Sequence, residues 1–274
     1  MTTTLLITGG ATGLGKSIAL MWASQQKSAV NICIADINKE RGDATVTEIK
    51  NLGADACYVH CDITKQDDIA HLRAAIHQQW QSIDIVINNA GVASGGSLQG
   101  ESIEQWQWIF DINLLGMVRV SQAFYPDFKA QGHGYFINIA SQAGLTPIPF
   151  MNSYNAVKAA VVGLSETMKL ELAFDNIDVS VVCPSFFKTN LDESMRTSEP
   201  AMKKMMDRAF DKSDITAEQV AASIYHAAQK RTFLILTHKL GKQVFLMKKL
   251  LPTAMYIKSM LKKTKSMQRL IQKP

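Results

Sequence analysis

Tyr154 and Lys158 are the residues of this chain whose types and spacing best suit acid–base chemistry. They stand four positions apart near the start of a predicted helix over 153–175, so their side chains share one helix face. A tyrosine with an ordinary pKa of about 10 is a poor base near neutral pH. A nearby ammonium favours the phenolate and lowers this pKa, which would make proton exchange with an alcohol feasible.

Two other polar groups follow predicted strands and make the pair more specific. Ser141 lies 13 residues before Tyr154, at the end of one strand, and Asn88-Asn89-Ala90-Gly91 ends another. A tyrosine and a lysine at this spacing are common by chance, and these neighbours make the pair a more specific signal.

A glycine-rich turn follows the first predicted strand and opens the first helix. It reads Thr8-Gly9-Gly10-Ala11-Thr12-Gly13-Leu14-Gly15. Glycines let the backbone approach a pyrophosphate without a Cβ clash, and the helix amino terminus offers unpaired N–H groups. The position of the turn between a strand and a helix is the context that a dinucleotide site needs.

Asp36 ends the second predicted strand, 21 residues after Gly15. A carboxylate there can accept hydrogen bonds from both hydroxyls of the adenosine ribose and repels a 2′-phosphate. Neither Thr12 nor Ile37 is a basic residue that would attract that phosphate. The sequence therefore favours NAD as the cofactor, with NADP as the alternative.

The elements that must position these residues alternate along the chain. Short apolar runs, expected to be buried strands, occur at Thr4–Thr8, Asn31–Ala35, Ala56–Cys61, Ile83–Asn88, Tyr135–Ala140, Val179–Cys183 and Phe233–Thr237. Helical patterns fill 14–27, 39–52, 65–80, 102–131, 153–175 and 216–230, with helix-start signals at Thr64 and Thr216. This predicts a Rossmann-type α/β fold, a doubly wound parallel seven-stranded sheet in a single domain over 1–237.

At this point the sequence resembles the short-chain dehydrogenase/reductase family, over essentially residues 3–237. The pieces that match, in order, are Thr8–Gly15, Asp36, Cys61-Asp62, Asn88–Gly91, Asn113, Ile139-Ala140-Ser141, Tyr154 with Lys158, and Pro184 with Thr189. Together they are highly specific. One departure stands out: the family usually has Pro-Gly after the sixth strand, where this chain has Pro184-Ser185.

The resemblance implies a catalytic set of four residues. Tyr154 would exchange a proton with the substrate oxygen, and Ser141 would hydrogen-bond the same oxygen. Lys158 would hold the nicotinamide ribose and lower the pKa of Tyr154, while Asn113 would position a water in a proton relay through Lys158.

The resemblance also implies a set of cofactor-binding residues. Asp62 would face the adenine, Asn89 would support the nucleotide-binding loop, and Thr189 would contact the nicotinamide carboxamide. The full set is Gly9, Thr12, Gly13, Leu14, Gly15, Asp36, Asp62, Ile63, Asn89, Ala90, Gly91, Tyr154, Lys158, Pro184 and Thr189.

Residues 188–214 break the alternation of strands and helices, and in this family such a segment commonly covers the substrate. It contains Met195, Met202, Met205 and Met206, which would give a lid an adaptable apolar lining or would be ordinary core residues. Further apolar candidates for the same cleft are Leu145, Ile148, Pro149, Phe150 and Met151. We therefore expect a lipophilic alcohol or ketone, such as a steroid, a retinoid, or a fatty or aromatic alcohol.

Charge is divided unevenly along the chain. Residues 1–237 hold 19 Lys/Arg against 24 Asp/Glu, whereas residues 238–274 hold 10 Lys/Arg and no acid. The basic end is amphipathic, and Pro252 would divide it into two short helices or start the second one. Such an extension can lie in a membrane interface, or it can dock on the catalytic body or a neighbouring subunit. The acidic body does not suit a nucleic-acid partner.

The remaining features bound the protein class. The four cysteines, Cys33, Cys57, Cys61 and Cys183, lack the spacing of a metal site and read as reduced thiols on buried strands. The amino terminus lacks the pattern of a signal peptide, and no apolar run is long enough to span a membrane, so a cytoplasmic protein is expected.

The leading hypothesis is an NAD-dependent oxidoreductase acting on a secondary alcohol or ketone. The alternatives are an NADPH-dependent carbonyl or 3-oxoacyl reductase, which Asp36 disfavours, and a nucleotide-binding scaffold without turnover. Such scaffolds usually lose the tyrosine or the lysine, and both are present here. A homodimer or homotetramer is expected by analogy, with helices 102–131 and 153–175 packing across a two-fold axis.

Overall fold

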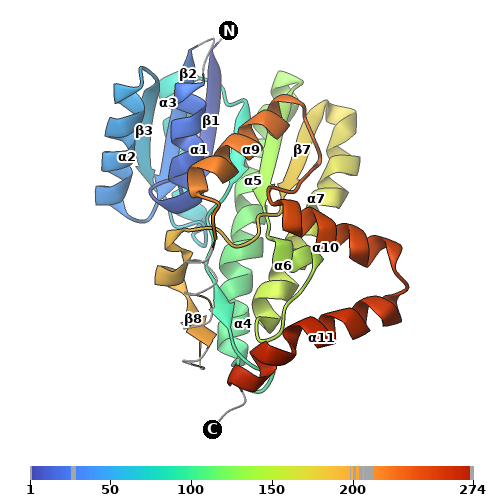
Figure 1. The fold of residues 1–274 in the computed structure, drawn as a ribbon. Helices are drawn as coiled ribbons and strands as arrows, with labels where there is room; N and C mark the ends of the chain where they lie inside the picture. Colours follow the sequence, from blue (N-terminus) through green and yellow to red (C-terminus); the bar gives the residue numbers. More distant parts are fainter. Residues whose placement is uncertain are drawn as a thin grey trace.

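The computed structural model describes residues 2–25, 29–197, 199, 202, 203, 206 and 213–271. Seven parallel strands form the central sheet, in the order β3-β2-β1-β4-β6-β7-β9 (Figure 1). Their bounds are β1 Thr3–Thr8, β2 Val30–Asp36, β3 Asp55–His60, β4 Ile85–Asn88, β6 Gly134–Ile139, β7 Ile177–Val182 and β9 Leu234–Ile235. All seven predicted strands and the doubly wound fold are confirmed.

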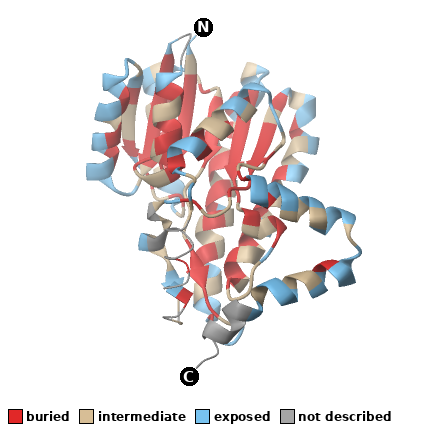
Figure 2. Ribbon diagram, viewed as in Figure 1, coloured by how far each residue is buried: buried red, intermediate tan, exposed pale blue. Residues whose placement is uncertain are grey.

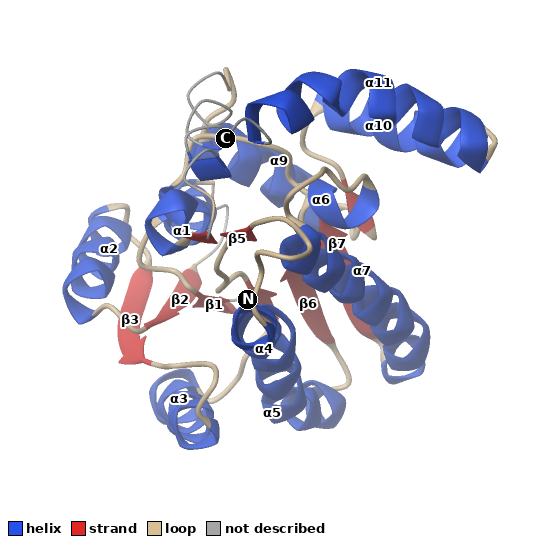
Figure 3. Cartoon of the chain, turned by 90° about the horizontal axis from the view of Figure 1, so that it is seen from below, coloured by secondary structure: helices blue, strands red, loops and turns tan. Residues whose placement is uncertain are grey.

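The strands are apolar along their whole length because both faces of the sheet are covered. Leu5 and Ile7 of β1 point into one core layer with α1, α2 and α9, while Leu6 points into the opposite layer with α3, α5 and α7. Figure 3 shows the helices on both sides of the sheet. Burial on both faces removes the alternation of polar and apolar residues that a half-exposed strand would have.

The sequence predicts six helices between the strands, and the described residues form eight. Their bounds are α1 Gly13–Ser24, α2 Lys39–Asn51, α3 Gln66–Trp80, α4 Ile103–Phe110, α5 Met117–Gln131, α6 Gln142–Leu145, α7 Asn152–Leu172 and α9 Ala217–Gln229. The predicted helix over 102–131 continues from α4 to α5 through a π-helical segment, η1 (Asp111–Gly116), which contains Asn113. Such local widenings of a helix are frequent at functional sites.

The two predicted helix starts have different outcomes. Thr216 caps α9 in a complete capping box with Gln219, as its sequence pattern indicates. The prediction at Thr64 is wrong, because α3 begins at Gln66 with Lys65 as its N-cap. The hydroxyl of Thr64 donates instead to the carboxylate of Asp62, 2.7 Å away. This hydrogen bond replaces the capping hydrogen bond that the sequence pattern predicts.

Two short strands join distant parts of the chain. β5 (Ser94–Gly95) pairs in parallel with β8 (Arg196–Thr197), which lies in the segment predicted to cover the substrate. Between β7 and β8 lies a short 3-10 helix, η3 (Asn190–Ser194). The pairing fixes the described part of this segment beside the carboxyl edge of the sheet.

The basic end of the chain forms two helices, α10 (Lys239–Leu250) and α11 (Thr253–Ile271), separated at Pro252 as predicted. We call them the C-terminal hairpin. Figure 1 shows α10 leaving the body and α11 returning below it. In the described part of the chain, no helix has the length and apolar character needed to cross a membrane.

Candidate active site

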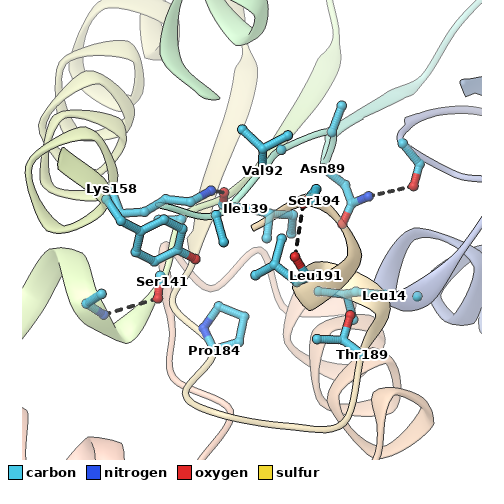
Figure 4. A pocket seen from close by; sticks show the side chains of 18 of the residues that line it. Leu14, Asn89, Val92, Ile139, Ser141, Lys158, Pro184, Thr189, Leu191 and Ser194 are labelled. Atoms are coloured by element: carbon cyan, nitrogen blue, oxygen red, sulfur yellow. Dashed lines mark hydrogen bonds between the residues drawn. The ribbon is translucent and has the colours of Figure 1, made fainter. Parts of the chain in front are cut away.

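A cleft of about 950 Å³ lies at the carboxyl edge of the sheet. Residues that directly follow the parallel strands line it, among them Gly9 after β1, Asn89 after β4 and Ser141 shortly after β6. This edge is where open α/β sheets bind ligands. Figure 4 shows Lys158, Ser141 and Pro184 on one side of the cleft and Leu14, Asn89 and Thr189 on the other.

The glycine-rich turn presents open backbone to the cleft. Gly9 and Gly13 have φ angles of +63° and +53°, which residues with a side chain rarely adopt. Thr12 is the N-cap of α1 and makes no capping hydrogen bond with its side chain. Its hydroxyl and the first N–H groups of α1 are therefore available to an anion, so the turn fits a pyrophosphate.

Gly15 serves the turn in a different way from the other predicted cofactor residues. It does not line the cleft, and a Cβ at this position would overlap the carbonyl oxygen of Gly9 and lie 2.6 Å from Nδ2 of Asn89. The glycine is needed because α1 packs closely against the turn.

Asn89 and Thr8 hold the turn against the end of β4. The Nδ2 group of Asn89 donates to the carbonyl oxygens of Thr8 (3.0 Å) and Gly9 (2.9 Å). The hydroxyl of Thr8 accepts hydrogen bonds from the backbone N–H groups of Asn89 and Ala90. Asn89, Ala90 and Gly91 all line the cleft, so these bonds set the shape of its floor.

Asp36 and Asp62 lie at the end of the cleft expected to hold adenosine. The Asp36 carboxylate accepts from the N–H groups of Ala11 (3.1 Å) and Asn38 (3.0 Å), which fixes its orientation. Burial by itself would raise the pKa of Asp62, but two hydrogen bonds from Thr64 outweigh it and hold the pKa below its ordinary value. Ile63 lines the same end of the cleft.

An ion pair that the sequence does not indicate lies at the adenosine end of the cleft. Arg41 of α2 and Glu193 of η3 both line the cleft, with Nη1 of Arg41 2.8 Å from Oε2 of Glu193. The pair joins the adenosine end of the cleft to the predicted lid segment. These residues are 152 positions apart, so no local pattern indicates the contact.

Tyr154 and Lys158 project from the first turns of α7 and are 7% and 6% exposed. The Nζ atom of Lys158 donates to the carbonyl oxygen of Ile139 (3.0 Å) and lies 5.9 Å from the centroid of the Tyr154 ring (Figure 4 shows the bond to Ile139). Both side chains line the cleft, as their spacing on one helix face predicts.

Burial controls the ionisation of this pair. It raises the pKa of Tyr154, and the interaction with the Ser141 side chain only partly offsets the increase. Burial also lowers the pKa of Lys158 to about 8. The pKa of Tyr154 is thus raised, contrary to the expectation from its lysine neighbour, because removing the phenolate from water outweighs the hydrogen bond from Ser141.

Ser141 is fixed by the helix that follows it. It is the N-cap of α6, and its Oγ atom accepts a hydrogen bond from the N–H of Ala143 (3.1 Å). The hydroxyl lines the cleft beside Tyr154. Since capping uses Oγ as an acceptor, the hydroxyl can still donate its proton, to the Tyr154 oxygen or to a substrate oxygen beside it.

Asn113 lies behind the cleft wall. Its Oδ1 atom accepts from the N–H of Val92 (2.8 Å), and its Nδ2 group donates to the carbonyl oxygen of Val92 (2.9 Å). A Cβ on Gly91 would lie 3.1 Å from Oδ1 of Asn113 and 3.7 Å from Nζ of Lys158. Asn113 does not itself line the cleft, so it holds the loop after β4 close to Lys158.

Glu101 holds the amino terminus of α7, which carries Tyr154. Met151, the N-cap, gives no side-chain hydrogen bond, and Oε2 of Glu101 accepts from the N–H of Ser153 instead (2.9 Å). Glu101 is 6% exposed, and burial raises its pKa above the ordinary value with a smaller contribution from the charge of Glu199, while hydrogen bonds from Ser153 offset part of the increase. No sequence pattern indicates this cap, because Glu101 lies 52 positions away.

The loop after β7 contains the departure from the family pattern. The N–H of Ser185 donates to Nδ1 of His238 (3.2 Å), and Nε2 of His238 lies 3.1 Å from the carbonyl oxygen of Phe186, which places the ring proton on Nε2. Burial lowers the pKa of His238, consistent with a neutral ring. His238 directly precedes α10, so it ties the loop with Pro184 and Thr189 to the C-terminal hairpin.

Some of the apolar residues predicted to line the cleft do so, and others do not. Ile148, Met151 and Met206 line it, whereas Leu145, Pro149 and Phe150 do not. Met202 is fully buried, and Met195 packs against the same apolar cluster as Tyr154. Met205 lies outside the described residues.

The C-terminal hairpin supplies part of the cleft wall, which the sequence does not indicate. Leu240, Gly241 and Val244 of α10 and Met260 of α11 line the cleft. The Nε2 group of Gln142, next to Ser141, donates to the carbonyl oxygen of Gly241 (3.2 Å). The hairpin therefore docks on the catalytic body, although only along one side.

Residues 3–200 match the family model described as short chain dehydrogenase. The chain belongs to this family. Short chain dehydrogenases are oxidoreductases acting on CH–OH and keto groups, and the cleft of this member carries the tyrosine, lysine and serine at the positions expected from the resemblance.

Curated relatives align with most of the chain. The 3-oxoacyl-[acyl-carrier-protein] reductase FabG of Thermotoga maritima is 30% identical over 217 residues, 78% of this chain and 87% of its own length. The D-beta-hydroxybutyrate dehydrogenase of Rhizobium meliloti is 32% identical over 251 residues, 87% of this chain and 96% of its own.

Solved structures of the family superpose closely. A short chain dehydrogenase/reductase from Burkholderia phymatum in complex with NAD has a TM-score of 0.84 at 26% identity, and covers 99% of this chain and 97% of its own. A short-chain dehydrogenase from Sphingobium yanoikuyae in complex with NADPH has a TM-score of 0.72 at 24% identity, and covers 85% of this chain and 87% of its own, a likeness of fold.

Proposed function

We propose that this short chain dehydrogenase transfers a hydride between NAD(H) and a lipophilic secondary alcohol or ketone. The observation that carries the proposal is one cleft with two ends: an open glycine turn and Asp36 at one, and Ser141, Tyr154 and Lys158 beside apolar side chains at the other. Geometry of this kind brings a bound dinucleotide and a carbonyl carbon together, which is the main requirement of hydride transfer.

The protein residues manage the proton. In the reducing direction Tyr154 donates its phenolic proton to the substrate oxygen, and in the oxidising direction the phenolate removes it. Ser141 hydrogen-bonds the same oxygen and stabilises the charge that develops on it. Lys158 binds the ribose of the cofactor and keeps a positive charge near the phenol, while Asn113 acts by positioning the loop at Gly91 and by holding a water of the proton relay.

The dinucleotide is proposed to lie along the carboxyl edge of the sheet. Its pyrophosphate would meet Gly9, Thr12, Gly13 and Leu14, and its adenosine would meet Asp36, Asp62 and Ile63, which all line the cleft. The nicotinamide, which accepts or delivers the hydride, would contact Pro184 and Thr189. Asn89, Ala90 and Gly91 would form the floor between the two ends.

The preference for NAD rests on Asp36 and on the state of Arg41. The Asp36 carboxylate faces the cleft and would repel a 2′-phosphate. Arg41 is a basic side chain of the cleft lining on which the charge of Asp36 acts, and Glu193 is paired with it at 2.8 Å.

The substrate end of the cleft supports a lipophilic substrate. Among its lining residues, Trp108, Ile148, Met151, Met206 and Val244 are apolar. The carboxylate of Asp111, which also lines the cleft, is paired with Arg119 at 2.6 Å. A substrate with an extended apolar body would gain burial there, and the charge of Asp111 is already paired.

A substrate screen tests this proposal. Purified protein is given NAD with hydroxysteroids, retinol, long-chain alcohols or small polar alcohols, and absorbance of NADH is followed. The account predicts that kcat/KM rises with the apolar size of the alcohol. Turnover confined to small polar or acidic alcohols would contradict it.

An NADPH-dependent 3-oxoacyl reductase is the second candidate. Two observations favour it: the identity to FabG of Thermotoga maritima, and the presence of Arg41 in the cleft lining. Comparing the dissociation constants of NAD and NADP separates the candidates. A non-catalytic scaffold is disfavoured because Asn113, Ser141, Tyr154 and Lys158 are all retained.

We also propose a homodimer or homotetramer in which α4, α5 and α7 pack across a two-fold axis. Leu115 in η1 and Leu170 of α7 are 46% and 74% exposed, so these elements offer apolar surface to a second copy. Sedimentation equilibrium tests this, and a monomer at micromolar concentration would contradict it.

A further inference from the structure

The C-terminal hairpin projects from the catalytic body and contacts it only near the cleft. Figures 1 and 3 both show α10 and α11 extending to one side of the sheet and its covering helices. Gly241 accepts a hydrogen bond from Gln142, and Lys248 donates to the carbonyl oxygen of Leu145. Phe245 packs against an apolar cluster of the body that includes Leu145. Tyr256 of α11 is also buried, whereas many other described residues of both helices are exposed.

Large apolar side chains on this surface are exposed. Leu246 and Leu250 follow each other at i, i+4 on α10 and are 54% and 72% exposed, and Ile257 and Leu261 do so on α11 at 49% and 57%. Figure 2 shows exposed and half-buried residues along both helices. Apolar stripes at helical spacing are normally buried against another surface. None of the described residues covers this apolar face of the hairpin, so we expect another molecule to cover it.

The same hairpin carries a concentrated positive charge. Residues 238–274 contain ten Lys/Arg and no acid. Lys258, Lys262 and Lys265 form an exposed stripe along α11. The cover of this surface must therefore be anionic as well as apolar, and a second copy of the same surface does not suit it because like charges would meet.

We propose that the C-terminal hairpin docks the protein on the surface of a bilayer containing anionic phospholipid. Leu246, Leu250 and Leu261 insert at the level of the acyl chains, and the lysine stripe contacts the phosphate groups. Amphipathic helices with this division of residues lie in the interface plane, held by buried apolar area and by attraction to anionic lipid. The helices rest on the membrane and do not cross it.

The docked hairpin also places the cleft beside the bilayer. Leu240 and Val244 of α10 and Met260 of α11 line the cleft, while Leu246, Leu250 and Leu261 of the same helices are exposed. A lipophilic alcohol dissolved in the bilayer would reach Tyr154 along the hairpin without crossing water. This route rests on the proposed lipophilic substrate, whereas the docking itself does not.

Vesicle flotation of the full chain tests the docking. Phosphatidylcholine vesicles with and without phosphatidylglycerol are compared at low and high salt. We expect flotation only with the anionic vesicles, weakened by salt. The variant Lys258→Gln/Lys262→Gln/Lys265→Gln should lower the partition coefficient by roughly 100-fold, since each cation near such a surface contributes about fivefold.

Apolar and control variants separate the two contributions. Leu246→Ser/Leu250→Ser/Leu261→Ser should lose flotation at any salt concentration. Lys50→Gln/Lys230→Gln and Leu52→Ser/Leu98→Ser, which change exposed residues of the catalytic body, should float as the parent does. Thermal melting checks that every variant is folded.

Several results would overturn the docking. One is a parent chain that does not float with anionic vesicles, and another is a hairpin variant that floats as well as the parent. A third is a hairpin variant that differs from the parent in molar mass by light scattering but floats equally well. The surface would then be an interface between copies of the chain. Turnover of a small soluble alcohol, measured without vesicles, should be equal in the parent and in all variants. If no protein turns the alcohol over, the proposed function is contradicted. If a hairpin variant loses flotation and keeps turnover, the hairpin acts in docking and not in catalysis.

Discussion

The Nζ atom of Lys158 lies 5.9 Å from the centroid of the Tyr154 ring and donates its hydrogen bond to the carbonyl oxygen of Ile139. The lysine is thus held by the end of β6 and not by the phenol. Burial raises the pKa of Tyr154 and lowers that of Lys158 to about 8. The pair is therefore arranged to keep the phenol protonated at neutral pH, which suits proton donation to a carbonyl.

This ionisation predicts a pH profile for the reducing direction. The ammonium of Lys158 is present below its pKa of about 8 and is lost as the pH rises through it, while Tyr154 stays protonated. We expect kcat/KM for ketone reduction to be constant below pH 8 and then to fall by about tenfold per unit, as for one required proton.

The variant Lys158→Arg provides the control for that profile. A guanidinium remains charged throughout this range, so the variant should be slower but should show no fall near pH 8. If kcat/KM of the parent stays constant well above pH 8, the charge of Lys158 is not required for reduction.

Cofactor selectivity should respond to Asp36. Asp36→Ser removes a charged acceptor for the ribose hydroxyls, and we expect the dissociation constant of NAD to rise by roughly tenfold while that of NADP falls. Fluorescence titration with NADH and NADPH measures both constants. Unchanged constants would mean that the adenosine ribose lies elsewhere.

Arg41 should become available when its partner is removed. Glu193→Gln is expected to improve NADP binding by up to about fivefold, the value of an exposed ion pair, and to leave NAD binding nearly unchanged. Asp43→Asn, which breaks the exposed pair with Lys39 away from the cleft, is the matched control and should alter neither constant. Equal NADP binding in all three proteins would exclude Arg41 from cofactor selection.

Glu101 should affect both stability and catalysis through α7. Glu101→Ala removes the hydrogen bond to the N–H of Ser153 and should cost about 1 kcal/mol of unfolding free energy, the usual value of a helix cap. It should also lower kcat, because Tyr154 follows that N–H by one residue. Circular dichroism melts and turnover measure the two effects.

Unlike Glu101→Ala, the variant Glu101→Gln should not lower the melting temperature at neutral pH. Because the folded-state pKa of Glu101 is raised, its stabilising contribution is complete below the unfolded pKa and declines as the pH rises. Gln keeps the acceptor without the charge, so its melting temperature should equal the parent's near pH 4 and match or exceed it at pH 7. A lower melting temperature at pH 7 would mean that the charged form of Glu101 stabilises the fold.

Local patterns predict much of this molecule. The strands follow from apolar runs, and the turn at Gly9 and Gly13, Asp36 and the Tyr154/Lys158 pair follow from residue type and spacing, because each depends on neighbours close in the chain. Thr64 shows how such reasoning fails: Asp62, two residues away, takes the hydroxyl that was expected to cap α3.

The features that the sequence did not indicate are contacts between distant residues. Arg41 meets Glu193 across 152 positions, Gln142 meets Gly241 across 99, and Ser153 meets Glu101 across 52. The pKa of Tyr154 belongs to the same class, because burial is a property of the assembled fold. None of these leaves a periodic signal in the chain, so they become visible only when the elements are placed in space.

Proton exchange at Tyr154 is the central claim, and Tyr154→Phe tests it most directly. The variant keeps the ring, which lies in the apolar cluster, and removes only the hydroxyl. Turnover of the best alcohol or ketone substrate should fall by about 100- to 10,000-fold while the dissociation constant of NADH stays within about twofold. Turnover equal to the parent's, with NADH binding intact, would contradict the account.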